Sequence, residues 1–301
     1  MNVPSGGPVV IAGSSGLIGR ALAAELTRRG ATVRRLVRRA PAGEGEVRWD
    51  PSAGQLDTSA LAGAAAVINL AGAGIGDRRW TAARKRVLRD SRLTGASLLA
   101  DAITETPEPP EVLIGASAIG FYGERGDAVV TESAEPGRGF LAQLCQDWET
   151  AAQPEASVRT VLLRTGVVLA ADGAFLRRQL PLFKLGLGGR LGPAGRWVSW
   201  ISLTDTIAAI VHLLDSDVSG PVNLTAPNPV TNAEFTRALG QALRRPAVLP
   251  VPRLLPSLLL GTEAVAALTQ SARVIPEALL ADGFEFNEPE VASALAATLR
   301  A

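Results

Sequence analysis

A short apolar run followed at once by spaced glycines is the feature that most constrains how this chain can fold. Residues 9 to 12, Val-Val-Ile-Ala, predict a buried strand, and Gly13, Gly16 and Gly19 follow it in a G-x-x-G-x-x-G pattern. Residues 20 to 29 then have the apolar spacing of a helix. A strand, a glycine turn and a helix in this order predict the phosphate-binding turn of a doubly wound α/β fold.

Each glycine has its own physical reason in such a turn. Gly13 allows the chain to turn tightly off the strand, Gly16 lets a pyrophosphate approach the backbone, and Gly19 lets the helix pack closely on the strand. Phosphates then meet free N–H groups at the positive end of the helix dipole. The alternative, a glycine-rich turn without a ligand, is disfavoured by the strand before it and the helix after it. We expect dinucleotide contacts at Gly13, Ser14, Ser15, Gly16, Leu17, Ile18 and Gly19.

The second predicted strand, residues 31 to 37, ends at two arginines. Folds of this kind that prefer NAD usually have an acidic residue here, which binds the ribose 2′-hydroxyl. Arg38 can instead bind a 2′-phosphate through a charge-assisted, bidentate contact. The sequence therefore favours NADP(H) as the cofactor. The alternative is that Arg38 and Arg39 are solvated charges at the end of a strand.

The next part of the chain alternates between strands and helices. Apolar runs predict strands at residues 64–70, 112–117 and 158–169, and helical patterns lie between them at 84–103 and 140–152. The resulting βαβαβαβ order is typical of a Rossmann-type, doubly wound parallel sheet.

The pattern changes beyond Phe175. Residues 180–200 are rich in glycine and aromatic residues, which suggests either a substrate lid or a packed irregular segment. Further helices are predicted at 205–214 and 233–243, the second with a Thr231–Glu234 capping box. We expect an NADP-binding Rossmann domain over residues 1–225, with part of 170–200 facing the substrate cleft, and a small, mainly helical C-terminal lobe over 226–301.

Composition excludes several classes of protein. The net charge of +1 gives no electrostatic argument for binding nucleic acid or an anionic membrane. The single cysteine, Cys145, excludes an internal disulfide and fits a reducing compartment. No cluster of Cys, His and carboxylates indicates a metal, no signal peptide is evident, and no run of residues is apolar enough to span a membrane. We expect a cytoplasmic protein whose partner is a small-molecule substrate.

Several short motifs, spread over nearly the whole chain, together suggest a family. The chain resembles the extended short-chain dehydrogenase/reductases, and within them an atypical group of NAD(P)-dependent epimerase/dehydratase-like proteins that have their own C-terminal domain. The motifs that carry the resemblance are Ile68-Asn69-Leu70-Ala71-Gly72, Arg79-Trp80-Thr81, Ser91-Arg92, Trp148-Glu149, Arg164-Thr165-Gly166-Val167-Val168-Leu169, Trp197-Val198-Ser199-Trp200-Ile201 and Gly283-Phe284-Glu285-Phe286.

The resemblance implies a Rossmann domain that binds NADP(H) and a small C-terminal lobe that helps to close the substrate cleft. It also implies that the glycine turn holds the pyrophosphate, and that further contacts reach the adenosine phosphate, the adenine side and the nicotinamide. The cofactor contacts implied beyond the glycine turn are Val37, Arg38, Leu70, Ala71, Gly72, Arg92 and Val168.

One departure from the superfamily affects the chemistry. Active members use a Ser or Thr together with a Tyr-x-x-x-Lys pair on one helix, in which the tyrosine is the acid/base and the lysine lowers its pKa. Here Leu141 stands at the tyrosine position and Cys145 at the lysine position. Ala118 stands at the expected hydroxyl position, four residues before the only tyrosine, Tyr122. The usual acid/base pair is therefore absent.

The remaining candidates for polar chemistry each have a structural alternative. Tyr122 and Ser117 are the candidates for polarising a reacting oxygen, but the tyrosine could equally pack the strand end and the serine could cap its turn. Arg190 and Trp200 are candidates for holding an anionic substrate, although such segments also pack structurally. Cys145 has no evident base beside it, which is typical of an inert cysteine.

Two hypotheses from different classes follow. The first is an NADP(H)-binding oxidoreductase or epimerase-like enzyme that acts on an unknown small polar substrate, with Tyr122 and Ser117, or substrate and water, in place of the missing acid. The second is a catalytically silent NADP-sensing or scaffold protein. The Leu- and Ala-rich C-terminal tail is compatible with a homodimer.

Overall fold

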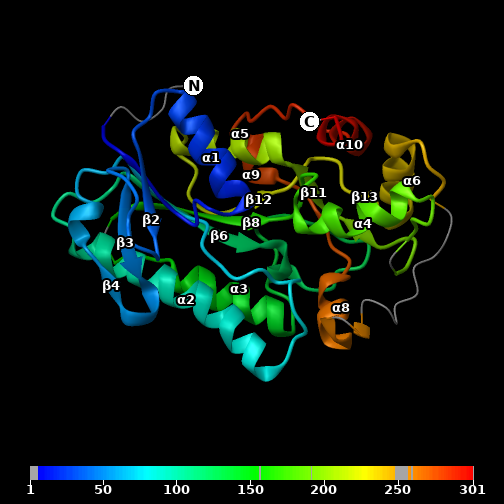
Figure 1. Cartoon of the computed structure of the whole chain (residues 1–301), viewed down its shortest axis with the longest axis horizontal. Helices are drawn as coiled ribbons and strands as arrows, with labels where there is room; N and C mark the ends of the chain where they lie inside the picture. Colours follow the sequence, from blue (N-terminus) through cyan, green and yellow to red (C-terminus); the bar gives the residue numbers. More distant parts are fainter. Residues whose placement is uncertain (1–5, 156, 191, 248–256, 259, 301) are drawn as a thin grey trace.

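The computed structural model, which describes residues 6–155, 157–190, 192–247, 257–258 and 260–300, is built around one eight-stranded sheet (Figure 1). The strand order is β12-β8-β6-β5-β1-β2-β3-β4, and every neighbouring pair is parallel except β3 and β4. This confirms the predicted α/β class and the parallel sheet. The strands are β1 (Val9–Ala12), β2 (Val33–Val37), β3 (Glu46–Asp50), β4 (Gln55–Leu56), β5 (Ala66–Asn69), β6 (Val112–Ala118), β8 (Arg159–Thr165) and β12 (Gly220–Leu224).

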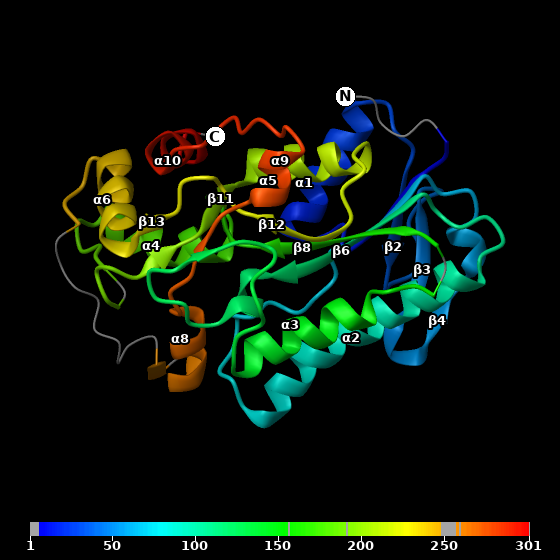
Figure 2. The ribbon, with the colours of Figure 1, turned by 180° about the vertical axis from the view of Figure 1, so that it is seen from behind.

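Helices cover both faces of the sheet, as a doubly wound fold requires (Figures 1 and 2). On one face lie α1 (Leu17–Arg28), α5 (Leu203–Leu214) and α9 (Glu277–Ala281), whose apolar side chains share a core with the central strands. On the other face lie α2 (Ala82–Glu105) and α3 (Phe140–Ala151), which pack against each other. The sheet is consequently buried on both sides, and β1 and β5 consist entirely of buried residues.

A second apolar cluster forms a smaller lobe at the end of the molecule opposite β3 and β4 (Figure 2). Its core contains Leu176, Phe183, Trp200, Phe235 and Leu295, all buried. The elements that supply these and the neighbouring residues are α4 (Ala174–Lys184), β9 (Val167–Leu169), β10 (Trp197–Val198), β11 (Trp200–Ser202), β13 (Val230–Thr231), α6 (Asn232–Leu243) and α10 (Val291–Thr298).

The lobe does not follow the predicted division of the chain in every part. Leu279 and Phe284, within the predicted lobe at residues 226–301, pack into the core of the main sheet, and α9 contacts β12. Conversely, α4 belongs to the lobe although it precedes residue 225. Further elements are β7 (Val129–Val130), which pairs with β14 (Arg273–Val274), and α8 (Thr262–Leu268). The chain therefore passes between the two cores more than once, and the boundary at residue 225 stays a prediction.

Local signals in the sequence explain several helix ends. The Ser202 hydroxyl accepts a hydrogen bond from the Asp205 N–H at the start of α5, and the predicted Thr231–Glu234 capping box is present at the start of α6. The predicted strand at 158–169 is in fact two strands. At Gly166 the chain leaves the main sheet, and a Cβ added there would lie 2.7 Å from the Ser199 carbonyl oxygen. Strand β9 pairs instead with β11.

Among the residues that the structure describes, no helix is both long and apolar enough to cross a membrane. The same residues contain no group of three or more Cys, His, Asp and Glu side chains arranged to hold a metal ion.

Candidate functional site

The glycine turn lies at the point where the strand order changes direction. From β1 the chain continues to β2 and β3 on one side, and it returns to β5 on the other side of β1. The carboxyl ends of β1 and β5 therefore border the crevice in which doubly wound sheets bind their ligands. Gly13 has φ of 81°, and a Cβ at this position would lie 2.6 Å from the carbonyl carbon of Leu70. Only glycine fits where these two loops meet.

The other two glycines keep the start of α1 open. A Cβ on Gly19 would lie 2.3 Å from the Gly13 carbonyl oxygen, so this glycine allows the helix to approach the turn. Gly16 is the N-cap of α1, where no side chain caps the helix and no acidic residue stands in the first turn. The N–H groups of this helix end are therefore not neutralised by a carboxylate, which suits an anionic group.

The two arginines at the end of β2 have different surroundings. Arg39 donates to both carboxylate oxygens of Glu46, at 2.7 and 2.6 Å, and is thereby tied to β3. Arg38 is exposed and makes no hydrogen bond or ion pair within the described part of the chain. Of the two, Arg38 is the arginine that is free to bind an anion. Val37, the last residue of β2, is half-buried beside it.

The loop after β5 is held by Arg92. Its Nη2 donates to the Ala73 carbonyl and its Nη1 to the Leu88 carbonyl, both at 3.0 Å. The guanidinium also lies 5.1 Å from the centre of the Trp148 ring, and its burial lowers the pKa of Arg92 from the usual value. Arg92 thus fixes the segment Leu70–Ala71–Gly72, and a Cβ on Gly72 would lie only 3.4 Å from the guanidinium carbon. The predicted residues of this loop are therefore brought together with Arg92.

Val168, the residue predicted to reach the nicotinamide, is half-buried in β9 opposite Ile201 and packs against the main core. It follows the carboxyl end of β8, at the same edge of the sheet as the glycine turn. Asp172, just beyond β9, forms an exposed ion pair of 3.0 Å with Arg20 of α1. The segment after β9 therefore lies against the start of α1.

The two tentative catalytic residues are parts of a buried polar network. The Ser117 hydroxyl donates to Glu149 at 2.6 Å, and Arg164 binds both oxygens of Glu149 at 2.9 Å. The Tyr122 hydroxyl donates to Asn223 Oδ1 at 2.6 Å and accepts from Arg164 at 3.0 Å. Tyr122 is completely buried and Ser117 almost so.

This geometry favours the structural alternative for both residues. Each hydroxyl already donates its proton inside the network, and neither is open to a substrate. Burial also raises the pKa of Tyr122. The pairing of Glu149 with Arg164 was not predicted from the sequence, although both residues belong to the motifs that carry the family resemblance. Partners fifteen residues apart leave no local pattern.

The helix that would carry Tyr-x-x-x-Lys is apolar at both positions. Leu141 and Cys145 are buried, and a Cβ on Gly120 would lie 3.3 Å from Leu141 Cβ and 3.8 Å from Cys145 Sγ. Burial raises the pKa of the Cys145 thiol to about 12, which confirms that this cysteine is unsuited to be a nucleophile. Leu141 packs with Trp80 and with Ala264 of α8, so the C-terminal region covers this end of α3.

Of the two residues predicted to hold a substrate, Trp200 is contradicted by the structure. Its ring is completely buried in the core of the lobe, and its indole N–H donates to the Asn228 carbonyl at 3.1 Å. The aromatic-rich pattern that suggested a lid reflects this core. Arg190 is exposed, but it lies beside α6 with three other arginines and not with the residues of the glycine turn.

Together, a doubly wound parallel sheet, a glycine turn at its switch point and a small C-terminal lobe define an extended short-chain dehydrogenase/reductase. The model of the NAD dependent epimerase/dehydratase family matches residues 9–225, and a domain of unknown function, DUF1731, matches residues 251–298. The chain belongs to the NAD dependent epimerase/dehydratase family.

Named relatives extend over nearly the full length of the chain. The epimerase family protein Mb2239 of Mycobacterium bovis is 48% identical over 290 residues, which cover 95% of this chain and 96% of the relative. The human epimerase family protein SDR39U1 is 36% identical over 292 residues, with 95% and 98% covered. The solved structure of human SDR39U1 (isoform 2) with NADPH has a TM-score of 0.89 at 33% identity and covers 97% of this chain and 99% of that one.

Proposed function

We propose that the protein binds NADP(H) in the crevice between the carboxyl ends of β1 and β5 and uses it as an oxidoreductase or epimerase-like enzyme on a small polar substrate. The observation that carries the cofactor part is the pair of arginines after β2: Arg39 is bound to Glu46, whereas Arg38 is exposed and unpaired among the described residues. A free guanidinium at this position matches a 2′-phosphate, which only NADP(H) carries.

The residues around the crevice fit such a cofactor. Gly13 and Gly19 occupy positions that a Cβ would block, and Gly16 leaves the start of α1 without a capping side chain. The pyrophosphate would bind at this helix end, and Arg38 would bind the 2′-phosphate. The fact that human SDR39U1 was solved with NADPH supports the same cofactor for this chain.

When bound, the nicotinamide supplies a hydride or accepts one. The chain's own contribution is mainly to position and to exclude water: Arg92 fixes the loop after β5, and the apolar Leu141 and Val168 would border the reacting end. Since Tyr122 and Ser117 already donate their protons within the buried network, we propose that substrate or water supplies the proton that the superfamily's tyrosine would otherwise transfer.

A second candidate is a catalytically silent NADP(H) sensor or scaffold. The specific observation in its favour is that Leu141 and Cys145 replace the acid/base pair and are buried, so that α3 offers no proton donor. Such a protein would bind the cofactor through the same residues but would not turn it over.

The test is calorimetric titration of the purified protein with NADPH and with NADH. We expect Arg38→Ala to weaken NADPH binding by about 1.5–3 kcal/mol, since a hydrogen bond to a charged group is lost, and to leave NADH binding unchanged. Arg35→Ala is the matched control, because Arg35 is exposed on the same strand and is not predicted to touch the cofactor. Equal weakening of both cofactors by Arg38→Ala would contradict the assignment of Arg38.

The same preparation separates the two candidates. Nicotinamide fluorescence is followed while the NADPH complex is exposed to a panel of carbonyl compounds. Sustained oxidation by any member would remove the silent alternative. Tight NADPH binding with no oxidation across a broad panel would favour the sensor.

A further inference from the structure

The basic residues are distributed unevenly over the two parts of the molecule. The lobe segments 174–200 and 226–247 contain eight Lys and Arg residues and one acidic residue, out of 30 and 29 in the whole chain. The rest of the chain is therefore net negative, although the overall charge is only +1. A local excess of one sign of charge creates a field that attracts a partner of the opposite sign.

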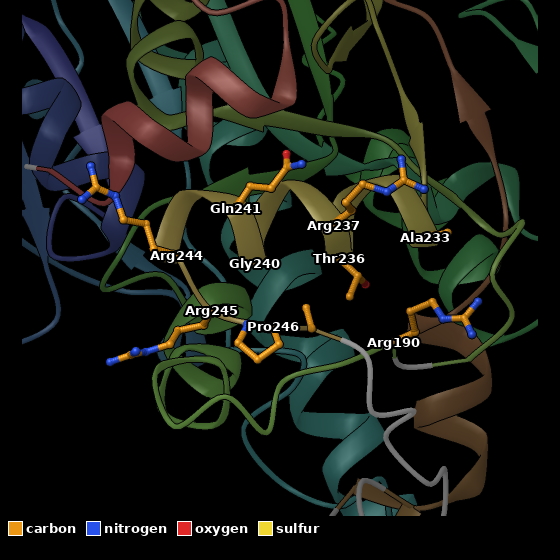
Figure 3. Close-up of a pocket in the computed structure, with 10 residues that line it drawn as sticks. Arg190, Ala233, Thr236, Arg237, Gly240, Gln241, Arg244, Arg245 and Pro246 are labelled. Carbon is orange, nitrogen blue, oxygen red and sulfur yellow. The ribbon is translucent and has the colours of Figure 1, made fainter.

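Part of this excess gathers around an open groove of about 660 Å³ beside α6, which we call the arginine groove (Figure 3). Arg237, Gln241 and Arg244 lie along one edge of it, and Arg190 and Arg245 along the other. Gly240 is a further lining residue, between Arg237 and Arg244 in the sequence. The groove shares no lining residue with the glycine turn or with the loop after β5.

The spacing of the arginines defines the size of ligand that they can bind together. Arg237 and Arg244 are seven residues apart, so their Cα atoms are separated by about 10 Å along the helix, or two turns. Figure 3 shows that their guanidinium groups point apart and not to one spot. A single phosphate could not touch both, whereas an extended ligand with several negative charges could.

The guanidinium groups of the groove are largely free. Within the described part of the chain, the guanidinium groups of Arg190, Arg237 and Arg244 make no hydrogen bond or ion pair. Arg245 donates only through Nε, to the Lys184 carbonyl at 3.0 Å. The nearby Glu234 accepts two hydrogen bonds from Thr231 in the capping box of α6 and also interacts electrostatically with Arg237, so Arg237 is the groove arginine that is partly neutralised.

An independent observation concerns the backbone of Arg244. It ends α6 in the left-handed conformation, with φ of 54°, and it is the only non-glycine residue with positive φ in the described ranges. Glycine is the residue normally found at such a helix end, because a Cβ makes this conformation unfavourable. An arginine at a position that glycine would stabilise indicates that its side chain serves a purpose other than stability.

We propose that the arginine groove is a docking site for an acidic segment of a partner protein. The groove combines positive charge with the alkyl surfaces of Ala233, Pro246 and Ala247, which suits a peptide that has both carboxylates and apolar side chains. None of the described residues that line the groove is aromatic, so these residues offer no platform for stacking bases. The net negative remainder of the chain also disfavours a long nucleic acid that would run past the groove.

The test uses a fluorescently labelled, 15-residue helical peptide that carries glutamates seven residues apart and alanines between them. Its binding to the full chain is measured by anisotropy at low salt, with the same peptide in which Gln replaces Glu as the probe control. We expect saturable binding of the acidic peptide that weakens as salt is added. The double variant Arg237→Gln/Arg244→Gln should bind it about tenfold more weakly, since two charged contacts are lost.

Two further variants separate docking from a general charge effect. Arg177→Gln removes an exposed arginine of α4 that does not line the groove, and it should change the affinity less than about twofold. Arg244→Gly should raise the unfolding temperature by about 2 °C, because the left-handed strain is relieved, while it weakens peptide binding. A gain in stability together with a loss of binding is not expected of a residue that only ends a helix.

Three outcomes would overturn the proposal. The first is no binding of the acidic peptide at low salt. The second is equal losses from Arg177→Gln and from the groove variants, which would mean that only net charge matters. The third is tighter binding of a short single-stranded oligonucleotide with the same number of negative charges as the peptide, lost in the same groove variants, which would assign the groove to nucleic acid.

Discussion

The carboxyl end of the main sheet has two regions that differ in how their polar groups are used. Around β1 and β5, glycines, an uncapped helix end and the exposed Arg38 leave backbone and charge available to a ligand. Around β6 and β8, Ser117, Glu149, Arg164 and Tyr122 are buried and bind one another. The polar groups of the first region are available to a ligand, whereas those of the second are already satisfied by hydrogen bonds within the protein.

The difference between the two regions shows that polar residues at the ends of neighbouring strands can serve either ligand binding or the stability of the fold. In the superfamily, the ends of these strands and helix α3 carry the hydroxyl, the tyrosine and the lysine. Here those three positions are Ala118, Leu141 and Cys145, and the polar residues that remain nearby connect β6, β8, β12 and α3. In this chain the polar groups of the region hold the sheet and helix α3 together.

The largest expected effect is the loss of the buried ion pair. Glu149→Ala leaves the Arg164 guanidinium, only 6% exposed, without its carboxylate, and we expect the free energy of unfolding to fall by about 3–5 kcal/mol. The measurement is urea denaturation followed by circular dichroism. Asp147→Asn, on the same helix but in a surface pair with Arg89, is the control and should cost less than about 1 kcal/mol. If the two variants lost equal amounts of unfolding free energy, the buried network around Glu149 would contribute no more to stability than a surface ion pair.

The next effect belongs to the glycine turn. Gly13→Ala forces a left-handed residue with a Cβ against the Leu70 backbone, so we expect a loss of about 2–4 kcal/mol from strain and overpacking. Gly16 has no positive φ, and a Cβ there would meet only the Gly13 carbonyl oxygen, at 3.3 Å. Gly16→Ala should therefore fold almost normally and still bind NADPH more weakly, because its methyl group would stand where we propose that the pyrophosphate approaches.

Denaturation and NADPH calorimetry on both variants separate these two functions of glycine. If Gly16→Ala bound NADPH as tightly as the unaltered protein does, the glycine turn would have only a structural role, and the contrast between the two regions would be wrong.

How far the sequence predicts these regions depends on the range of the contacts. The glycine turn, the helix caps and the apolar strands are local features, and the structure confirms them. From the sequence, Arg38 and Arg39 are both placed at the end of β2, where a 2′-phosphate could bind. Only the structure shows which of the two is already bound to another side chain. Glu46, which engages Arg39, stands on β3, a strand that the apolar pattern did not predict.

The buried network lay beyond sequence reasoning for the same reason. Tyr122 and Asn223 are 101 residues apart, and Ser117 and Glu149 are 32 apart, so their pairing depends on the order of strands in the sheet. Helix α4 is not predicted from the sequence, because it contains Pro181 and is followed by a glycine-rich segment. The sequence pattern makes Trp200 a candidate for holding a substrate, since an aromatic residue near glycines does not reveal which core it enters.

A smaller effect tests whether Tyr122 belongs to the structural region. Tyr122→Phe leaves Asn223 Oδ1 without its donor and removes an acceptor from Arg164, so we expect a loss of about 1–3 kcal/mol in the free energy of unfolding. NADPH affinity should not change. A double-mutant cycle with Asn223→Ala should give a coupling energy of about 0.5–3 kcal/mol. If Tyr122→Phe lost turnover but kept its stability, Tyr122 would instead have a catalytic role.

The smallest effect concerns the lysine position itself, where Cys145 places a buried, uncharged side chain. The thiol is buried, and its pKa is raised to about 12, whereas in the unfolded chain it loses its proton near pH 9. Between these values the unfolded state binds fewer protons than the folded state, so stability must fall as pH rises, by at most about 1.4 kcal/mol per pH unit. The loss from pH 8 to pH 10 should therefore be roughly 1 kcal/mol greater in the unaltered protein than in Cys145→Ala, in which all other titrating groups remain. Urea denaturation of both proteins at the two pH values measures this difference. An identical pH dependence in the two proteins would show that the thiol has the same pKa in the folded and the unfolded state. The side chain at the lysine position would then be exposed to water, as a catalytic side chain is.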